Sequence, residues 1–166
     1  MTSDMFEKEV LIFGCGNTLL GDDGFGPAVI EYLEKNFRLP PSVMALDAGT
    51  GIRGILFDLM LIETRPRELI VIDAVEYPGR TPGELFEIPV EGIPDAKAGD
   101  FSMHQFPTVN MLLELQDHAD IHVQILVVQI ESIPGEVRPG LSGPVAQAVP
   151  RACAYLMEKI ENILAV

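Results

Sequence analysis

The sequence predicts a single α/β domain: a three-layer sandwich with a mostly parallel central sheet and helices on both of its faces. Short apolar segments rich in Val, Ile and Leu alternate along the chain with segments that repeat apolar residues at the helical period. Parallel strands that are covered on both faces by crossover helices produce this pattern. The 166 residues suit one domain spanning residues 1–166, since no repeat or linker divides them.

Four segments are expected to form the centre of the sheet, because each is short, β-branched and bounded by Gly, Pro or Asp. They are Glu9–Gly14, Ser42–Asp47, Glu68–Ala74 and Ile121–Ile130. A fifth strand is expected at Gly83–Val90, where Pro89 lacks the N–H group that an inner strand would need. We therefore expect this fifth strand to be an antiparallel strand at the edge of the sheet.

Four helices are expected from the spacing of apolar residues. The first helix carries Pro27 near its start, where a missing N–H group is harmless, and the last contains Pro150, which we expect to kink it. The predicted helices cover Gly26 to about Phe37, Gly54–Glu63, Pro107–Asp117 and a segment that begins near Ser142. The loop from Glu91 to Met103 is a candidate mobile segment.

The charge of the chain excludes some partners. The formal net charge is −14 and the isoelectric point is about 4.4, so nucleic acids and anionic membranes, which attract basic surfaces, are not expected to bind. No apolar run reaches the roughly 18 residues of a spanning helix, and the start of the sequence does not resemble a signal peptide. We therefore expect a cytoplasmic protein.

Carboxylates follow three of the predicted strands. Asp22 and Asp23 lie in the glycine-rich turn after the first strand, Asp47 ends the second and Asp73 ends the third. Ligands of open parallel sheets bind at the carboxyl ends of the strands, so these groups are expected to converge. His104 lies just before the third helix. Two carboxylates and an imidazole suit a divalent ion such as nickel, zinc or manganese and leave positions open for a guest ligand.

These aspartates also have structural explanations. An aspartate at a strand end often caps the next helix or accepts hydrogen bonds from loop amides, which explains Asp22 and Asp47 as well as ligation does. The structural explanation is weaker for Asp23 and Asp73, because a charged group on a buried strand tip must be paired, ligated or protonated. His104 alone would indicate little, and it is the combination that favours a metal site.

The two cysteines and the other histidines are expected to be structural. Cys15 and Cys153 form no CxxC pair, so a disulfide framework or a structural zinc site is not indicated. Cys15 lies near a helix N-terminus, which can activate a thiol, but burial as a small residue is the simpler explanation. Cys153 suits the core, His118 follows a helix and His122 lies in a strand pattern.

A dinucleotide-binding enzyme is an alternative. Gly14, Gly16 and Asp47 resemble parts of a Rossmann fingerprint. Leu19 stands where the third glycine is needed, however, and the adjacent carboxylates of Asp22 and Asp23 would repel a pyrophosphate. No GxSxG, HExxH or P-loop motif occurs in the sequence, so those enzyme classes lack support.

The stretch GCGNTLLGDDGFG resembles the opening motif of the hydrogenase maturation endopeptidases, which trim the C-terminal extension from the large subunit of nickel-iron hydrogenases. Further motifs that resemble the family are LDAGT at Leu46–Thr50, VIDA at Val71–Ala74, His104 in MHQF, and IPGEVRPGLSGPV at Ile133–Val145. Together they cover nearly the whole chain. The sequences of these motifs are similar to those of members serving archaeal hydrogenases that reduce a deazaflavin coenzyme.

The resemblance implies an aspartic-type peptidase whose metal contacts are Asp23, Asp73 and His104. Nickel already seated in the precursor large subunit would be the recognition element, with no metal permanently bound to the peptidase. Well-known members have glutamate where this chain has Asp23, and Ala48 replaces the first glycine of a common DGGT motif.

For catalysis we expect Asp47 to activate water beside the nickel, with Asp23 also catalytic. The residues expected to line the approach of the substrate are Gly14, Gly16, Asn17, Gly49 and Thr50. A metal-binding maturation chaperone without hydrolytic activity would use the same ligands and is a second alternative.

Overall fold

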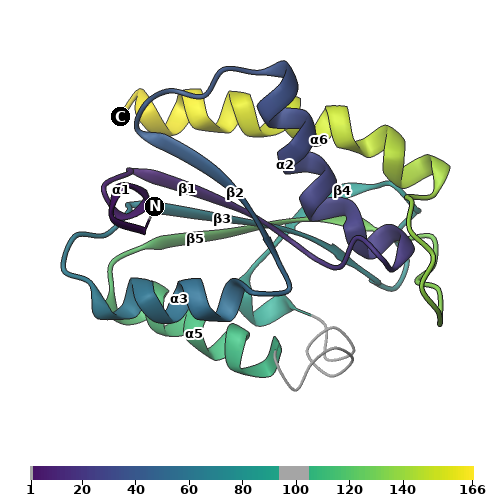
Figure 1. Cartoon of the computed structure of the whole chain (residues 1–166), viewed down its shortest axis with the longest axis horizontal. Helices are drawn as coiled ribbons and strands as arrows, with labels where there is room; N and C mark the ends of the chain where they lie inside the picture. Colours follow the sequence, from purple (N-terminus) through teal and green to yellow (C-terminus); the bar gives the residue numbers. More distant parts are fainter. Residues whose placement is uncertain (1, 94–104) are drawn as a thin grey trace.

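The computed structural model describes residues 2–93 and 105–166 of the chain. A five-stranded sheet in the order β2-β1-β3-β5-β4 forms its centre (Figure 1). Its strands are β1 Val10–Cys15, β2 Val43–Gly49, β3 Glu68–Val75, β4 Leu85–Ile88 and β5 His122–Gln129. All neighbouring pairs are parallel except β4 with β5. The predicted sheet and its antiparallel edge strand are therefore confirmed.

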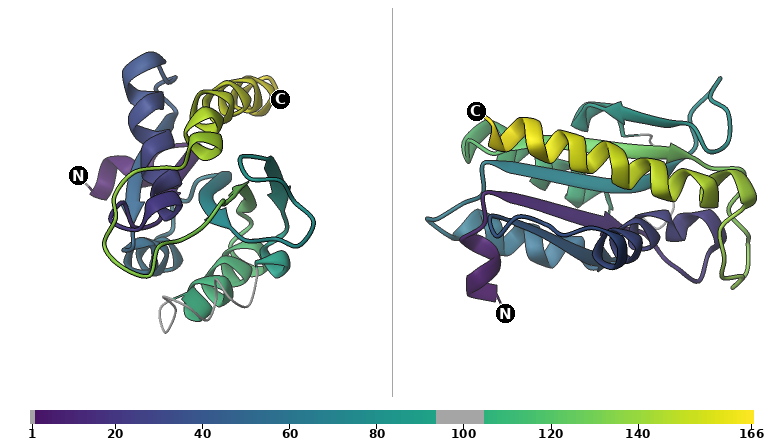
Figure 2. Two further views of the ribbon diagram at one scale, coloured as in Figure 1. Left: turned by 90° about the vertical axis from the view of Figure 1, so that its right-hand side faces the viewer. Right: turned by 90° about the horizontal axis from the view of Figure 1, so that it is seen from above.

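Helices cover both faces of the sheet (Figure 2). They are α2 Phe25–Asn36 and α6 Gly143–Leu164 on one face, and α3 Ile52–Leu61 and α5 Gln105–His118 on the other. Successive strand residues point to opposite faces. In β1, Ile12 belongs to the core beneath α2 and α6, whereas Phe13 belongs to the core beneath α3 and α5. This arrangement confirms the three-layer sandwich.

Two glycines allow α2 to lie unusually close to β1. A Cβ atom on Gly14 would lie 2.4 Å from the carbonyl oxygen of Gly26, and one on Gly26 would lie 2.3 Å from the carbonyl oxygen of Cys15. Side chains at either position would push the helix away from the strand. The close approach fixes the start of α2 directly behind the end of β1, where the first loop returns to the sheet.

Some local structure was not predicted. A short helix, α1, spans Thr2–Phe6, and 3-10 turns, η1 and η2, occupy Gly21–Gly24 and Val90–Gly92. Helix α6 continues through Pro150 without a break, and a bend at this residue stays a prediction. The described helices include none that is both long and apolar enough to cross a bilayer.

A polar cluster joins the edge strand to the last helix. Glu87 of β4 accepts hydrogen bonds from Tyr155 and Lys159 of α6. Burial opposes ionisation of Glu87, but the hydrogen bonds from Lys159 and Tyr155 and the charge of Lys159 outweigh it and lower the pKa of Glu87 below its ordinary 4.5. The ion pair therefore favours the folded state when both groups are charged.

The stabilising effect of Glu87 is expected to depend on pH. Because the folded pKa of Glu87 is lowered, its contribution is present above about pH 4.5 and is lost as the pH falls through the folded value. Glu87→Gln should therefore lower the free energy of unfolding at pH 7 by less than about 1 kcal/mol, since the group is only partly buried. The difference from wild type, measured by urea unfolding, should shrink on acidification.

Glu136→Gln is a suitable control, because Glu136 forms an ion pair with Arg138 in which both side chains are more than 70% exposed. Its effect should be close to zero at every pH. A Glu87→Gln difference that stayed constant from neutral to acid pH would contradict this account of the cluster.

Candidate active site at the carboxyl ends of the strands

Glycine allows the first loop to fold back beneath the end of β1. Gly16 has φ +135°, and a Cβ atom there would lie 1.8 Å from the carbonyl oxygen of Asp23. No other residue fits such a contact with backbone. The loop then enters the 3-10 turn η1, whose four residues are all buried. Gly16 thus lets Asp23 lie against the strand end.

The carboxylate of Asp23 is held by the backbone of the same loop. The N–H group of Asn17 donates to Oδ2 of Asp23 at 2.8 Å, and the side chain of Asn17 accepts from the N–H group of Leu19 at 3.0 Å. Only 3% of Asp23 is exposed. The contribution of Asn17 that the structure shows is therefore to position this carboxylate.

Asp23 lines a cavity of about 450 Å³. Asp73, near the end of the central strand β3, lines the same cavity and accepts a hydrogen bond from the N–H group of Ala74 at 2.8 Å. Two carboxylates that are fifty residues apart in the sequence therefore share one cavity, as the positions of the strand ends predicted. Gly16, Gly49 and Thr50 also line it.

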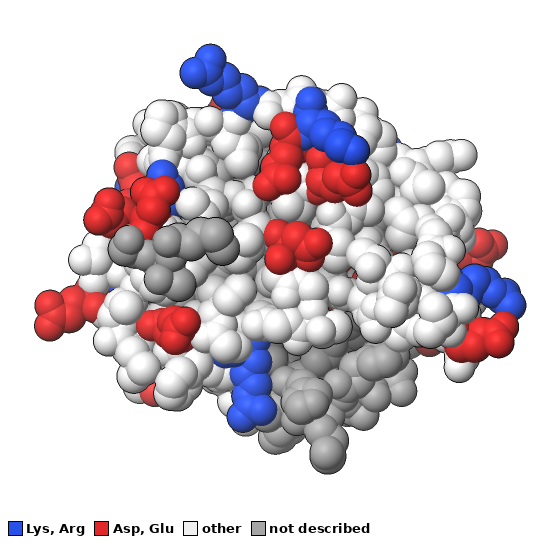
Figure 3. Space-filling model, in the orientation of Figure 1, with Lys and Arg blue, Asp and Glu red and all other residues white. Residues whose placement is uncertain are grey.

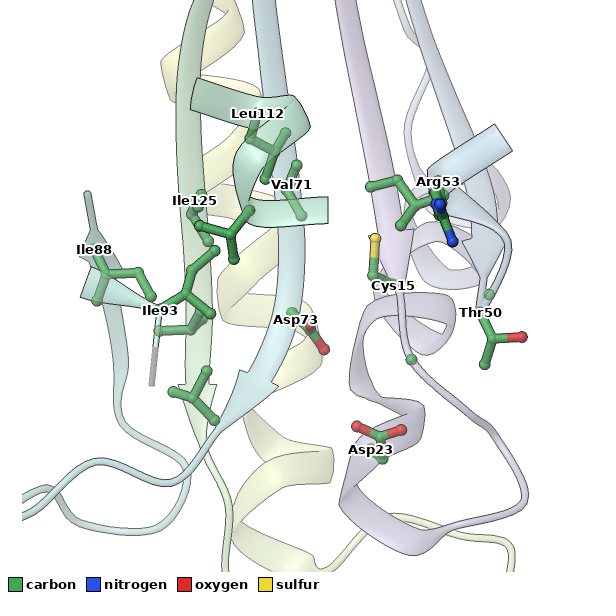
Figure 4. Close-up of a pocket in the computed structure, with 16 residues that line it drawn as sticks. Cys15, Asp23, Thr50, Arg53, Val71, Asp73, Ile88, Ile93, Leu112 and Ile125 are labelled. Atoms are coloured by element: carbon green, nitrogen blue, oxygen red, sulfur yellow. The ribbon is translucent and has the colours of Figure 1, made fainter. Parts of the chain in front are cut away.

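The cavity has a polar side and an apolar side. Figure 4 shows Asp23, Thr50 and Arg53 on one side and Val71, Ile88, Ile93, Leu112 and Ile125 on the other, with Asp73 between them. Cys15, which is 6% exposed, also lines the cavity. A guest can therefore meet carboxylate oxygens and an aliphatic wall at the same time.

The third predicted metal contact, His104, lies outside the described residues, as does most of the Glu91–Met103 loop. Within residues 2–93 and 105–166, no three carboxylate, imidazole or thiol groups gather closely enough to hold a metal ion. The described part of the site therefore provides two converging carboxylates, Asp23 and Asp73.

The other two histidines lie at the ends of elements. His118 ends α5, and His122 begins β5, where its Nδ1 lies 2.8 Å from Glu68.

Asp22 has a structural role, in contrast to Asp23, which lines the cavity. Its carboxylate accepts hydrogen bonds from the N–H groups of Glu131 at 2.9 Å and Ser142 at 2.7 Å, and from the Ser142 hydroxyl at 2.9 Å. Ser142 is the N-cap residue of α6. Asp22 is only 1% exposed. Its hydrogen bonds therefore join the first loop to the segment just after β5 and to the start of α6.

Three of the predicted site residues that the structure describes do not line the cavity. The first is Asn17, whose N–H group instead positions the Asp23 carboxylate; the others are Asp47 and Gly14. Asp47 is exposed at the end of β2, and its Oδ1 accepts a hydrogen bond from the N–H group of Gly49 at 2.9 Å. Gly14 faces α2, on the other side of the sheet, so the room that this glycine leaves is taken by a helix and not by a substrate. Gly49, which has φ +51°, does line the cavity.

Arg53 was missed because the predicted helix began one residue after it, whereas α3 begins at Ile52. The apolar wall was also missed, since it combines residues from β3, β4, α5 and β5 with Ile93, which follows η2. The spacing of these apolar residues along their helix and strands indicates only that they are buried. No local sequence pattern could therefore have assigned them to a shared cavity.

The fold and the cavity define a class: a three-layer α/β protein with an acidic site at the carboxyl ends of a parallel sheet. The family model described as "hydrogenase maturation protease" matches residues 27–159. This chain belongs to that family.

Two relatives and one solved structure illustrate the relationship. Coenzyme F420 hydrogenase subunit delta of Methanothermobacter thermautotrophicus is 39% identical over 93% of this chain and 96% of its own length. Hydrogenase 2 maturation protease of Escherichia coli is 27% identical over 94% of this chain and 88% of its own. The structure of the hydrogenase maturating endopeptidase HybD from E. coli has a TM-score of 0.75 and 26% identity, and 93% of each chain is covered.

These relationships confirm the predicted fold and family. They also support a hydrogenase maturation peptidase over the dinucleotide-binding and chaperone alternatives.

Removing the carboxylate of Asp22 is expected to destabilise the protein. Asp22→Ala leaves two backbone N–H groups and one hydroxyl without their acceptor in a buried position, which should cost roughly 2–4 kcal/mol of unfolding free energy. Denaturant unfolding monitored by circular dichroism measures this loss. Asp58→Ala, which removes an exposed carboxylate of α3, should change stability by less than about 0.5 kcal/mol. Equal effects of the two substitutions would contradict the structural role of Asp22.

Proposed function

We propose that this protein removes the C-terminal extension from the precursor large subunit of a nickel-iron hydrogenase after nickel insertion, and that it recognises the bound nickel. Membership of the maturation protease family gives the class of reaction. The convergence of Asp23 and Asp73 in one cavity is the observation that carries the recognition of a cation. The nickel is part of the substrate in this proposal.

The proposed nickel contacts are Asp23, Asp73 and His104. Carboxylate oxygens and an imidazole nitrogen are suitable ligands for nickel, and a set of three leaves positions for ligands from the precursor. Asp23 and Asp73 are supported by their place in the cavity. The assignment of His104 rests on the family motif in which it occurs.

In the proposed reaction, water adds to the carbonyl carbon of the scissile peptide bond, the C–N bond breaks, and a proton passes to the leaving amine. The precursor's nickel would anchor the bond beside an aspartate that accepts the proton from water. We assign this role to Asp47, with Asp23 as a further catalytic carboxylate, which makes the peptidase aspartic in type. Asp47 is exposed to water and lies two residues before Gly49, which lines the cavity.

The surface charge fits a protein partner whose surface is basic overall. The formal net charge is −14, and Figure 3 shows acidic side chains in several groups on one face, with basic side chains scattered among them. The relative from M. thermautotrophicus that is named as a subunit of coenzyme F420 hydrogenase supports an archaeal hydrogenase of this kind as the source of the precursor. The proposed location is the cytoplasm.

Nickel dependence tests the proposed recognition directly. The wild-type protein is incubated with nickel-loaded and with nickel-free precursor, and the intact mass of the large subunit is followed over time. Only the nickel-loaded precursor is expected to lose the mass of its extension, because the metal aligns the scissile bond. Equal cleavage of both forms would overturn nickel recognition, and no shortening of either would overturn the peptidase assignment.

Asp47→Asn tests the proposed water activation. General-base catalysis contributes roughly 10²- to 10⁴-fold, so kcat on nickel-loaded precursor should fall by about that factor while KM changes little. Asp58→Asn, in an exposed position of α3, should keep the wild-type rate. Near-normal cleavage by Asp47→Asn would remove this residue from the catalytic role.

A further inference from the structure

A second hollow adjoins the cavity on the outer surface of the molecule. It lies between α3 and α5, and its described lining residues are Arg53, Gly54, Phe57, Met60, Asn110 and Met111. Arg53 lines both this groove and the cavity that contains Asp23 and Asp73. The two hollows therefore lie next to each other at Arg53. We call the outer one the α3–α5 groove.

Three large apolar side chains line the α3–α5 groove, and one of them is exposed. Phe57 is 54% exposed, although a phenyl ring usually contributes to a core. Met60 and Met111 lie beside it in the groove, and methionine side chains adapt their shape to a partner. An exposed aromatic side chain flanked by two half-buried methionines, next to a binding cavity, is typical of a site that a peptide or protein covers.

Arg53 gives the groove a charge preference. It is the single basic side chain among the described residues that line the cavity. No described carboxylate lies within 4 Å of its guanidinium group, whereas the ion pairs found elsewhere in the described chain engage other arginines and lysines. In a chain of net charge −14, such an arginine is suited to a carboxylate supplied by a partner.

We propose that the α3–α5 groove binds the segment of the precursor that adjoins its scissile bond. An apolar side chain of this segment packs on Phe57, and an acidic side chain pairs with Arg53 at the junction with the cavity. This inference rests on the proposed function, because the substrate is the hydrogenase precursor. The groove thereby sets which precursor is accepted, while the carboxylates in the cavity contact the nickel.

Matched substitutions on one helix test the apolar part of the groove. Phe57→Ser should lower kcat/KM for nickel-loaded precursor by about tenfold or more, mainly through KM, as expected for an aromatic anchor. Phe57→Leu should keep most of the activity. Leu61→Ser is the control, because Leu61 is 69% exposed on the same helix but does not line the groove. It should stay within about twofold of wild type. Equal kcat/KM for Phe57→Ser and Leu61→Ser would overturn the proposal.

Binding separates failure of the groove from failure of the proposed function. Calorimetric titration of the same variants with nickel-loaded precursor reports affinity whether or not cleavage occurs. Weaker binding by Phe57→Ser alone supports the groove, even if the wild-type protein proves unable to cleave. Sedimentation of the free protein adds a further outcome: if Phe57→Ser converts a dimer to a monomer, a second copy of the chain occupies the groove and the proposal is overturned.

Charge exchange tests the role of Arg53. Arg53→Glu should weaken binding of the nickel-loaded precursor by about tenfold or more. Each acidic residue near the cleavage point of the precursor is then changed to Lys in turn. One of these changes should restore binding to Arg53→Glu while weakening binding to the wild-type protein. If none does so, Arg53 does not pair with an acidic side chain of the precursor, and that part of the proposal is overturned.

Discussion

The hydrogen bonds to the carboxylate of Asp22 are the interaction on which the site depends. Three donors from Glu131 and Ser142 converge on it, and both of these residues lie more than a hundred positions further along the chain. The first loop, the end of β5 and the start of α6 are held together by this one buried group (Figure 1). Asp23 is the next residue in the sequence, so the hydrogen bonds of Asp22 also fix the position of Asp23 in the cavity.

Adjacent aspartates have different environments because a 3-10 turn separates neighbouring side chains by about a third of a revolution. In η1, Asp22 therefore points toward the loop that precedes α6, while Asp23 points into the cavity. Gly16 also contributes, because it leaves room for the backbone of Asp23 at a place where any Cβ atom would clash. The glycines of this loop thus serve close backbone packing, which explains why a sequence that resembles a phosphate-binding loop lies beside two carboxylates.

The sequence was sufficient for the sheet, its edge strand and the convergence of Asp23 and Asp73, because hydrophobic period and strand-end topology determine all three. It was insufficient where a residue's role depends on partners distant in sequence. The face that Gly14 presents is decided by Gly26 of α2, and the apolar wall draws on four separate elements. Predicting the place of Arg53 required the correct start of α3, which lies two residues before the predicted start.

The two sides of the cavity divide recognition into two physical problems. Two carboxylates that line one cavity favour a cation, because each adds to the negative potential that the other produces there. Under the proposed function, these carboxylates cannot by themselves distinguish one nickel-bearing precursor from another, because the same ion would satisfy them in each. Discrimination must come from surface that contacts polypeptide. The aliphatic wall lines the same cavity as the carboxylates, and the α3–α5 groove shares Arg53 with that cavity, so both are placed to provide such a surface in the proposed function.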